Sequence, residues 1–248
     1  MKIKETTNVE LKKRLVKSLL TGLVFAIAII IAFKWASSGE KIDGISQPLR
    51  QSLDLNSKFG GAIYSDSNQS PPKTAPNRFP RTNGDIGLTS ALDLENYRVS
   101  VESGVTKLSL KLDEIKSIPF SEAATDFKCI EGWTEVFHYS GVRFSDFMKK
   151  FNVGLHEDGT PYRFVGLETP DGEYYVSLDI KSIMHSQSIL AFEMNGMPLR
   201  PQNGAPIRLI IPNKYGIKSL KRIGRIEFSD IRPPDYWHQR GYDWFAGL

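Results

Sequence analysis

The feature that most constrains this chain is an uncharged apolar run near its start. Residues 18–33 read SLLTGLVFAIAIIIAF. Basic residues flank the run on both sides, namely Lys12, Lys13, Arg14, Lys17 and Lys34. A membrane span needs about 17–25 residues, so this run is long enough only if Lys17 and Lys34 extend their ammonium groups to the two interfaces.

Three interpretations of the segment compete. A basic flank followed by an apolar run also describes a signal peptide, but the WASSGE stretch after Lys34 has no convincing small-residue cleavage site. A buried helix of a soluble core fits poorly with the basic block at the chain start. An uncleaved anchor fits best, because Trp35 then lies at the membrane interface. We therefore expect residues 1–35 to form a cytoplasmic N-terminus and one transmembrane helix.

The orientation of that helix follows from its charged flank. Lys and Arg residues near a span stay on the cytoplasmic side. The rest of the chain is then expected on the periplasmic or extracytoplasmic side of an inner (plasma) membrane, which it would cross once.

The distribution of charge bears on nucleic-acid binding. The net charge is +4, but residues 1–34 hold seven Lys or Arg and two Glu, so the other 214 residues carry −1. Binding to a phosphate backbone requires a basic surface on the folded body. We expect no nucleic-acid partner.

A single cysteine, Cys129, limits the chemistry further. One cysteine cannot form an intramolecular disulfide, so a disulfide-stapled scaffold is excluded. The residue is then a nucleophile, a metal ligand or an inert part of the core, and inert burial is common for cysteine. The four histidines are scattered and form no zinc motif.

Two further segments follow the apolar run. Residues 36–90 are rich in Ser, Gly, Asn and Pro, including Pro71, Pro72, Pro76 and Pro80, and predict a tether and extended lead-in. From residue 91 to 248 the composition is that of a folded domain. Residues 97–103 and 107–112 alternate apolar and polar residues as half-buried strands do, and residues 161–169 and 173–180 look like two further strands. Residues 206–213 are a β-branched apolar run, and residues 224–230 end the regular part. Residues 140–153 have the spacing of a short amphipathic helix. Short strands with few helices predict an α+β domain.

Three motifs in this domain go beyond composition. They are Cys129-Ile-Glu-Gly-Trp, the stretch MNGMPLRPQNGAPIRLIIPNKYGIKSLKRIGRIEF at 194–228, and the tail DYWHQRGYDWFAGL. Together they resemble the sulfite-oxidase-like molybdopterin-binding domain, from about Tyr97 to the end of the chain. The resemblance implies a fold of mixed short strands and few helices, and a molybdenum cofactor with a single pterin in its monophosphate form. It also implies that Cys129 is the catalytic residue that ligates molybdenum, and thiolate sulfur suits such a metal.

The same resemblance places five residues against the pterin: Asn203, Arg208, Ser219, Leu220 and Lys221. Cations and fixed amides at these positions are what a phosphate and a polar ring system require. The alternative for Arg208 and Lys221 is that they are ordinary solvated charges.

Other positions are weaker candidates. Thr169 in the LETPDG turn is a further pterin candidate, although threonine is also common in turns for local reasons. His138 and Tyr139 are candidates for the lining of a substrate funnel, His185 is expected to hold a loop by hydrogen bonding, and Arg240 is a candidate contact for an anionic substrate.

The cysteine motif departs from sulfite oxidases proper, which follow the cysteine with a Gly-Asn-Arg type sequence. The Cys-x-Glu-x-Trp form is closer to the periplasmic methionine-sulfoxide reductase catalytic subunit, although the tail around Tyr236 and Trp244 is not typical of that branch. We also expect no immunoglobulin-like dimerisation domain after Gly224.

These observations predict a molybdenum-dependent oxidoreductase that transfers an oxygen atom to or from a small S- or N-oxide, a methionine-sulfoxide-type substrate or a sulfur compound. Its electrons would be exchanged with a membrane haem or quinone-linked subunit, since the cofactor supplies the redox chemistry and the protein supplies binding and orientation. Two alternatives stay open: a non-catalytic membrane-anchored subunit or assembly protein that keeps the fold, and an accessory subunit of a respiratory complex.

Overall fold

The computed structural model describes residues 8–42, 45–63, 81–82 and 84–247. The chain divides into two units, Met1–Ser52 and Leu53–Leu248. This division differs from the boundaries at residues 35 and 90 that the sequence predicts. The prolines between residues 71 and 80 lie outside the described residues.

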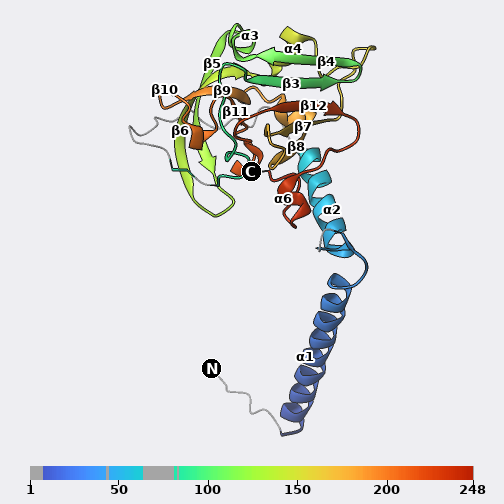
Figure 1. The fold of residues 1–248 in the computed structure, drawn as a ribbon. Coiled ribbons are helices and arrows are strands. Elements are labelled where there is room, and N and C mark those ends of the chain that lie inside the picture. The colour runs from blue at the N-terminus through green and yellow to red at the C-terminus, as the bar shows by residue number, and fades with distance from the viewer. Residues whose placement is uncertain (1–7, 43–44, 64–80, 83, 248) are drawn as a thin grey trace. The chain divides into compact units, whose positions relative to one another are not determined.

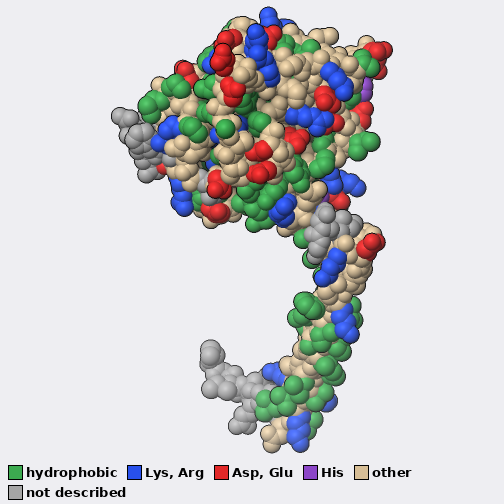
Figure 2. Space-filling view, in the orientation of Figure 1, with side chains coloured by type: hydrophobic (Ala, Val, Ile, Leu, Met, Phe, Trp, Pro, Cys, Tyr) green, Lys and Arg blue, Asp and Glu red, His purple; other side chains and the backbone are tan. Residues whose placement is uncertain are grey.

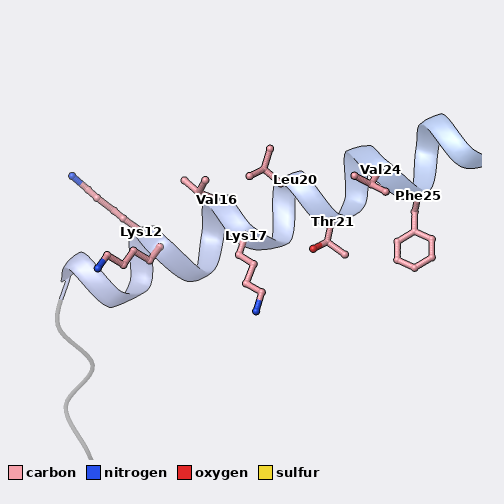
Figure 3. A pocket seen from close by; sticks show the side chains of 8 residues that line it. Lys12, Val16, Lys17, Leu20, Thr21, Val24 and Phe25 are labelled. Atoms are coloured by element: carbon pink, nitrogen blue, oxygen red, sulfur yellow. The ribbon is translucent and has the colours of Figure 1, made fainter.

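The first unit is dominated by helix α1, Asn8–Ala36. Its 29 residues span about 43 Å at 1.5 Å per residue, and its most apolar window has a mean hydropathy of 2.4 with no part buried. Val16, Leu20 and Val24 share one side of the helix (Figure 3), and hydrophobic side chains cover most of its length (Figure 2). An apolar surface of this length fits a single-pass membrane anchor by length and composition.

A short hairpin follows α1. Strands β1 (Lys41–Ile42) and β2 (Ile45–Ser46) pair antiparallel. The Ser46 hydroxyl donates to the carbonyl oxygen of Ala36, so the hairpin returns to the end of α1. Helix α2 (Gln47–Ile63) starts directly after it. This helix lies where the sequence predicts a tether, and it was not anticipated because Gly60-Gly61 and many polar residues weaken its helical pattern.

The first sheet of the second unit has the strand order β4-β3-β12-β7-β8. Its members are β3 (Arg98–Ser103), β4 (Thr106–Lys111), β7 (Phe164–Glu168), β8 (Tyr175–Asp179) and β12 (Arg225–Ser229). Strands β3, β7 and β8 lie within stretches predicted as strands, and β4 matches one except at Thr106. Strand β12 lies within residues 224–230, where the sequence places the end of the regular part. The alternation that reveals β3, with three of its six residues buried, arises because one face of the sheet packs on the core. Strand β12 runs parallel to β3 and antiparallel to β7.

The second sheet has the order β10-β9-β6-β5, and β11 also pairs with β9. Its members are β5 (Phe120–Lys128), β6 (Thr134–Arg143), β9 (Ile189–Met194), β10 (Met197–Pro198) and β11 (Arg208–Ile210). Of these, only β11 was predicted as a strand. Strands β5 and β6 form a long curved pair along one side of the domain (Figure 1).

One core lies between the two sheets. Val99 and Leu167 from the first sheet belong to the same buried cluster as Val142 and Leu190 from the second. Helix α4 (Phe144–Phe151) covers it, with Phe144, Phe147 and Met148 buried. The helix predicted over residues 140–153 is confirmed for this part, but residues 140–143 belong to β6. The remaining helices are short: α3 (Leu112–Lys116), α5 (Ile180–Ile183), α6 (Tyr236–Gln239) and the 3-10 turns η1 (Pro201–Asn203) and η2 (Gly216–Lys218). The α+β fold class is confirmed.

Candidate active site

Cys129 lies in the tight turn that joins β5 to β6. Its N–H donates to the carbonyl oxygen of Trp133 at 2.9 Å, and its own carbonyl oxygen accepts the N–H of Gly132 at 3.0 Å. Gly132 has a φ of 90°, a left-handed conformation that an L side chain adopts only with strain. The Cys-x-x-Gly-Trp spacing therefore builds a turn that holds a nearly buried thiol, 7% exposed, at the end of a hairpin.

Aromatic rings extend from this turn along β5 and β6. The ring centres of Phe127 and Trp133 are 6.0 Å apart, those of Phe127 and Phe137 5.8 Å, and those of Phe137 and Tyr139 5.9 Å. Tyr139 is fully buried, and its hydroxyl has no hydrogen-bond partner among the described residues. The rings give the cysteine hairpin an apolar wall of low dielectric.

Arg208 lies against that wall. Its guanidinium carbon is 5.7 Å from the ring centre of Phe127 and 5.8 Å from that of Tyr139. Nη1 donates to the carbonyl oxygen of Asn203 at 2.9 Å, and Nη2 to that of Ser219 at 3.3 Å. The side chain is 3% exposed, and burial lowers the pKa of Arg208. In the described part of the chain no carboxylate forms an ion pair with it, and its Nε lacks a hydrogen-bond partner.

Lys221 adds a second cation. Its Nζ donates to the carbonyl oxygen of Gly84 at 2.9 Å. Burial and the charge of Arg208 lower the pKa of Lys221 to about 8, while Asp85 acts in the opposite direction. A surface hollow of about 550 Å³ opens beside this lysine, lined by Thr82, Gly84, Asp85, Leu88, Pro201 and Gln202. Because the charge of Arg208 lowers the pKa of Lys221, an anion bound near both side chains would be favoured.

The other predicted residues complete the same cluster. Leu220 is fully buried, and its carbonyl oxygen accepts the N–H of Leu209 at 2.8 Å. The Ser219 hydroxyl accepts the N–H of Ile211 at 3.3 Å. Gly204 lies so close to Lys221 that an added Cβ would be 2.8 Å from the lysine Cβ. The cluster therefore brings Asn203, Arg208, Ser219, Leu220 and Lys221 together, in agreement with their predicted grouping.

The cysteine hairpin and this cluster meet at Phe127. A Cβ added to Gly216 would lie 2.5 Å from the Phe127 ring and 3.4 Å from the carbonyl oxygen of Lys128. Only a glycine in η2 permits this approach. Residues about 80 positions apart in the sequence are thereby packed into one site.

Thr169 has a different environment. Its hydroxyl donates to Asp171 Oδ1 at 2.6 Å and accepts the N–H of Tyr174 at 3.1 Å. A Cβ added to Gly87 would meet the Thr169 side chain at 2.5 Å, so the residue lies beside the segment that contacts Lys221. The local turn engages the hydroxyl, and its role at the pterin stays a prediction.

The weaker candidates divide. His185 accepts the N–H of Gln187 at 3.2 Å through Nδ1, and its predicted role in holding a loop is confirmed. His138 is on β6, next to Tyr139, and its Nε2 lies 3.4 Å from Oε2 of Glu122 on β5. The guanidinium carbon of Arg240 is 3.5 Å from the ring centre of Tyr236. The roles of His138 and Arg240 toward a substrate stay predictions.

Arg222 is a functional candidate that the sequence analysis did not identify. It is 2% exposed and has a left-handed φ of 51°. Its guanidinium donates to the carbonyl oxygens of Ala205, Leu88 and Ser90 at 3.2, 3.1 and 2.9 Å. These bonds fasten the end of the lead-in to the cluster. The only available signal was its position beside Lys221, because its partners are distant backbone atoms.

A second buried cation belongs to η2 itself. Lys218 is 1% exposed, forms an ion pair with the buried Asp235, and donates to the carbonyl oxygen of Ser177 at 3.1 Å. Asp235 also accepts the N–H groups of Ser177 and His238, each at 3.0 Å. Burial lowers the pKa of Lys218, and Asp235 opposes that shift. The C-terminal segment is thereby fastened to the loop that carries Gly216.

The donor set fits a molybdenum pterin cofactor. A thiol can ligate the metal, and a buried arginine with an unused Nε, flanked by a lysine of lowered pKa, suits a phosphate group. Within the described residues no cluster of three or more His, Cys, Asp or Glu offers a separate protein-only metal site.

Comparisons with known proteins agree with this fit. Residues 86–237 match the model of the oxidoreductase molybdopterin-binding domain. The chain is 32% identical over 157 residues to a putative protein-methionine-sulfoxide reductase subunit YedZ1 of Azospira oryzae, covering 63% of this chain and 58% of the relative. It is 36% identical over 177 residues to the protein-methionine-sulfoxide reductase catalytic subunit MsrP of Xanthomonas axonopodis pv. citri, covering 67% and 52%. The chain thus spans about half the length of the curated relatives it matches.

A solved structure shows the same fold. The sulfane dehydrogenase SoxCD from Paracoccus pantotrophus aligns with a TM-score of 0.51 at 20% identity, covering 58% of this chain and 41% of that one. A domain of this kind implies a molybdenum-pterin cofactor. The family match over more than half of the chain places the protein in the molybdopterin-binding oxidoreductase family.

Proposed function

We propose that this protein is a molybdenum-dependent oxidoreductase that reduces a small S-oxide of the methionine-sulfoxide type. The observation that carries the proposal is a buried arginine without a carboxylate partner among the described residues, packed beside the hairpin of the only cysteine. A buried charge is costly unless it is compensated, and an anionic cofactor would supply the compensation. The relatives, which are named as methionine-sulfoxide reductase subunits, support the choice of substrate and the direction of reaction.

One residue would bind the metal, and the others would bind the pterin. Cys129 would ligate molybdenum, which when bound supplies two-electron oxygen-atom transfer. Arg208 and Lys221 would hold the phosphate of a single pterin in its monophosphate form by charge-assisted hydrogen bonds. Asn203 and the backbone of Ser219 and Leu220 would fix the orientation of the pterin. The overall reaction consumes one sulfoxide, two electrons and two protons, and releases one sulfide and one water.

Helix α1 would anchor the domain on the periplasmic side of an inner membrane. Its apolar surface and basic N-terminal flank support this location. The two electrons must come from another redox centre, and a membrane haem or quinone-linked subunit would be held within reach by the anchor. If purified protein accepts electrons only from artificial dyes, and its native membranes add nothing, this partner is wrong.

The first experiment measures molybdenum and phosphopterin per chain after native purification from a cofactor-competent host. Near-equimolar amounts are expected for the unchanged chain, with a large loss of pterin in Arg208→Gln. The matched control is Arg225→Gln, since Arg225 is partly exposed and pairs with Glu102, Glu168 and Glu227. Absence of both molybdenum and pterin from the unchanged chain would support the non-catalytic alternative instead.

A further inference from the structure

Helix α2 is fastened to the folded domain by its small and polar face. The Ser57 hydroxyl donates to Asp243 Oδ1 at 3.3 Å, and Arg232 Nη1 forms an ion pair with Asp54 Oδ1 at 3.0 Å. A Cβ added to Gly60 would lie 2.5 Å from the Phe245 ring, so the helix approaches the C-terminal segment closely. These contacts fix which side of the helix faces the domain.

The opposite face of α2 is apolar and exposed. Leu55, Phe59 and Ile63 are 66%, 67% and 64% exposed. Their spacing of four residues places them in one stripe along the helix. Residues 55–63 contain no acidic side chain, and their single charge is Lys58. Surface helices of soluble domains normally turn such a stripe inward, so this helix presents the reverse arrangement.

The start of α2 is held at the end of α1. The Ser46 hydroxyl donates to the Ala36 carbonyl oxygen, and the Gln47 N–H donates to the Glu40 carbonyl oxygen at 3.1 Å. Gln47 is the first residue of α2, so a short hairpin, and not a long tether, separates the two helices. If α1 spans a membrane, α2 begins at its extracytoplasmic surface.

We propose that the stripe of Leu55, Phe59 and Ile63 lies in the lipid interface of the membrane that α1 spans. This inference rests on the proposed membrane anchor. An exposed apolar stripe without acidic residues, beside a lysine and next to a membrane helix, suits insertion at the boundary between headgroups and acyl chains. Lys58 can reach phosphate headgroups while Phe59 is inserted.

The test places a tryptophan on the stripe and asks whether lipid touches it. Phe59→Trp and Leu55→Trp are made in the full chain with its cofactor, in nanodiscs of ordinary or brominated phosphatidylglycerol and phosphatidylcholine. Bromine quenches tryptophan on contact, and the emission of the unchanged chain is subtracted. The control is Val105→Trp in the turn after β3, where Val105 is 90% exposed. Both stripe positions tolerate substitution because their side chains are exposed.

The added emission at positions 59 and 55 is expected to fall about twofold in brominated nanodiscs, with no change at position 105. Equal quenching at all three positions overturns the proposal. Blue-shifted but unquenched emission from the Phe59→Trp variant also overturns it, because a protein partner or a second copy then covers the stripe. Carbonate extraction distinguishes failure of the anchor: a chain that leaves the membrane lacks it, whereas an integral chain with unquenched emission at position 59 fails only this inference.

Discussion

Two buried cations of the same domain have opposite surroundings. Lys218 is paired with Asp235 and donates to the carbonyl oxygen of Ser177, so it joins η2 to the C-terminal segment and to β8. Arg208 is buried to a similar degree but contacts only carbonyl oxygens and aromatic rings within the described residues. A buried cation with its own carboxylate is complete as a structural element, whereas one without it requires an anion from outside. The difference distinguishes the structural ion pair of Lys218 and Asp235 from the candidate anion-binding site at Arg208.

The largest effect is expected at the cysteine side of the incomplete site. Cys129→Ala removes the proposed metal ligand and should lower sulfoxide reduction by more than about 100-fold, because changes in outer partners alone often cost that much. The free energy of unfolding should change little, because the variant keeps the β5–β6 hairpin. Activity and molybdenum content measured on the same preparation test this, and full activity in the variant would remove Cys129 from the mechanism.

Matched substitutions in the cofactor-depleted chain test whether the two cations contribute differently to stability. Lys218→Met leaves Asp235 buried without its partner and should reduce the free energy of unfolding by about 3–5 kcal/mol. Arg208→Met removes a cation that has no acidic partner and should cost about 1–2 kcal/mol through its lost hydrogen bonds.

Denaturant unfolding in detergent measures both effects. The double variant Lys218→Met/Asp235→Asn should regain part of the lost free energy of unfolding, because it has no buried carboxylate at position 235. If Arg208→Met destabilised the depleted chain more than Lys218→Met, the distinction between the two cations would fail.

The pH dependence of anion binding should follow Lys221. Its pKa of about 8 without an anion lies below the ordinary value for lysine, and a bound anion would raise it. The lysine is therefore charged below pH 8 and loses its proton above it. Affinity of the cofactor-depleted chain for inorganic phosphate should fall by up to about tenfold between pH 8 and pH 9. Calorimetry at the two pH values measures this, and Lys221→Arg should abolish the dependence by keeping its charge.

The smallest expected effect compares two left-handed glycines. Gly132, φ 90°, lies in the cysteine turn, and Gly159, φ 83°, in a surface loop; both have open space around an added Cβ. Alanine at either position should cost about 1 kcal/mol of stability. Only Gly132→Ala should also reduce molybdenum content, since it alone shifts the turn that holds Cys129. Equal molybdenum content in both variants would show that the turn tolerates this strain.

Sequence patterns anticipated the elements whose burial is regular. The alternation in β3 identified it because one of its faces lies on the core. Strand β5 was missed, since it has only one buried residue and its pattern FSEAATDFK shows little alternation. Strand β6 was also missed, although the burial of residues 134–139 alternates, because the first buried residue of that alternation is the charged Glu135. Helix α2 was missed because the partner of its Gly60, Phe245, is almost 190 residues away.

The candidate site also has parts that the sequence indicated and parts that it did not. Resemblance grouped Arg208 with Asn203, Ser219 and Lys221, and their contacts agree with that grouping. The approach of Gly216 to Phe127 and the pairing of Lys218 with Asp235 depend on how distant segments pack, and no local pattern encodes them.

The place of β12 in the first sheet has a consequence for the order of folding. It lies between the hairpins β3–β4 and β7–β8 and follows both of them in the chain. The two hairpins cannot join into one sheet until residues 225–229 are synthesised, and such distant pairing slows folding. This sheet is therefore completed only after residues 225–229 are made, so α1 (Asn8–Ala36) is synthesised long before the sheet can form.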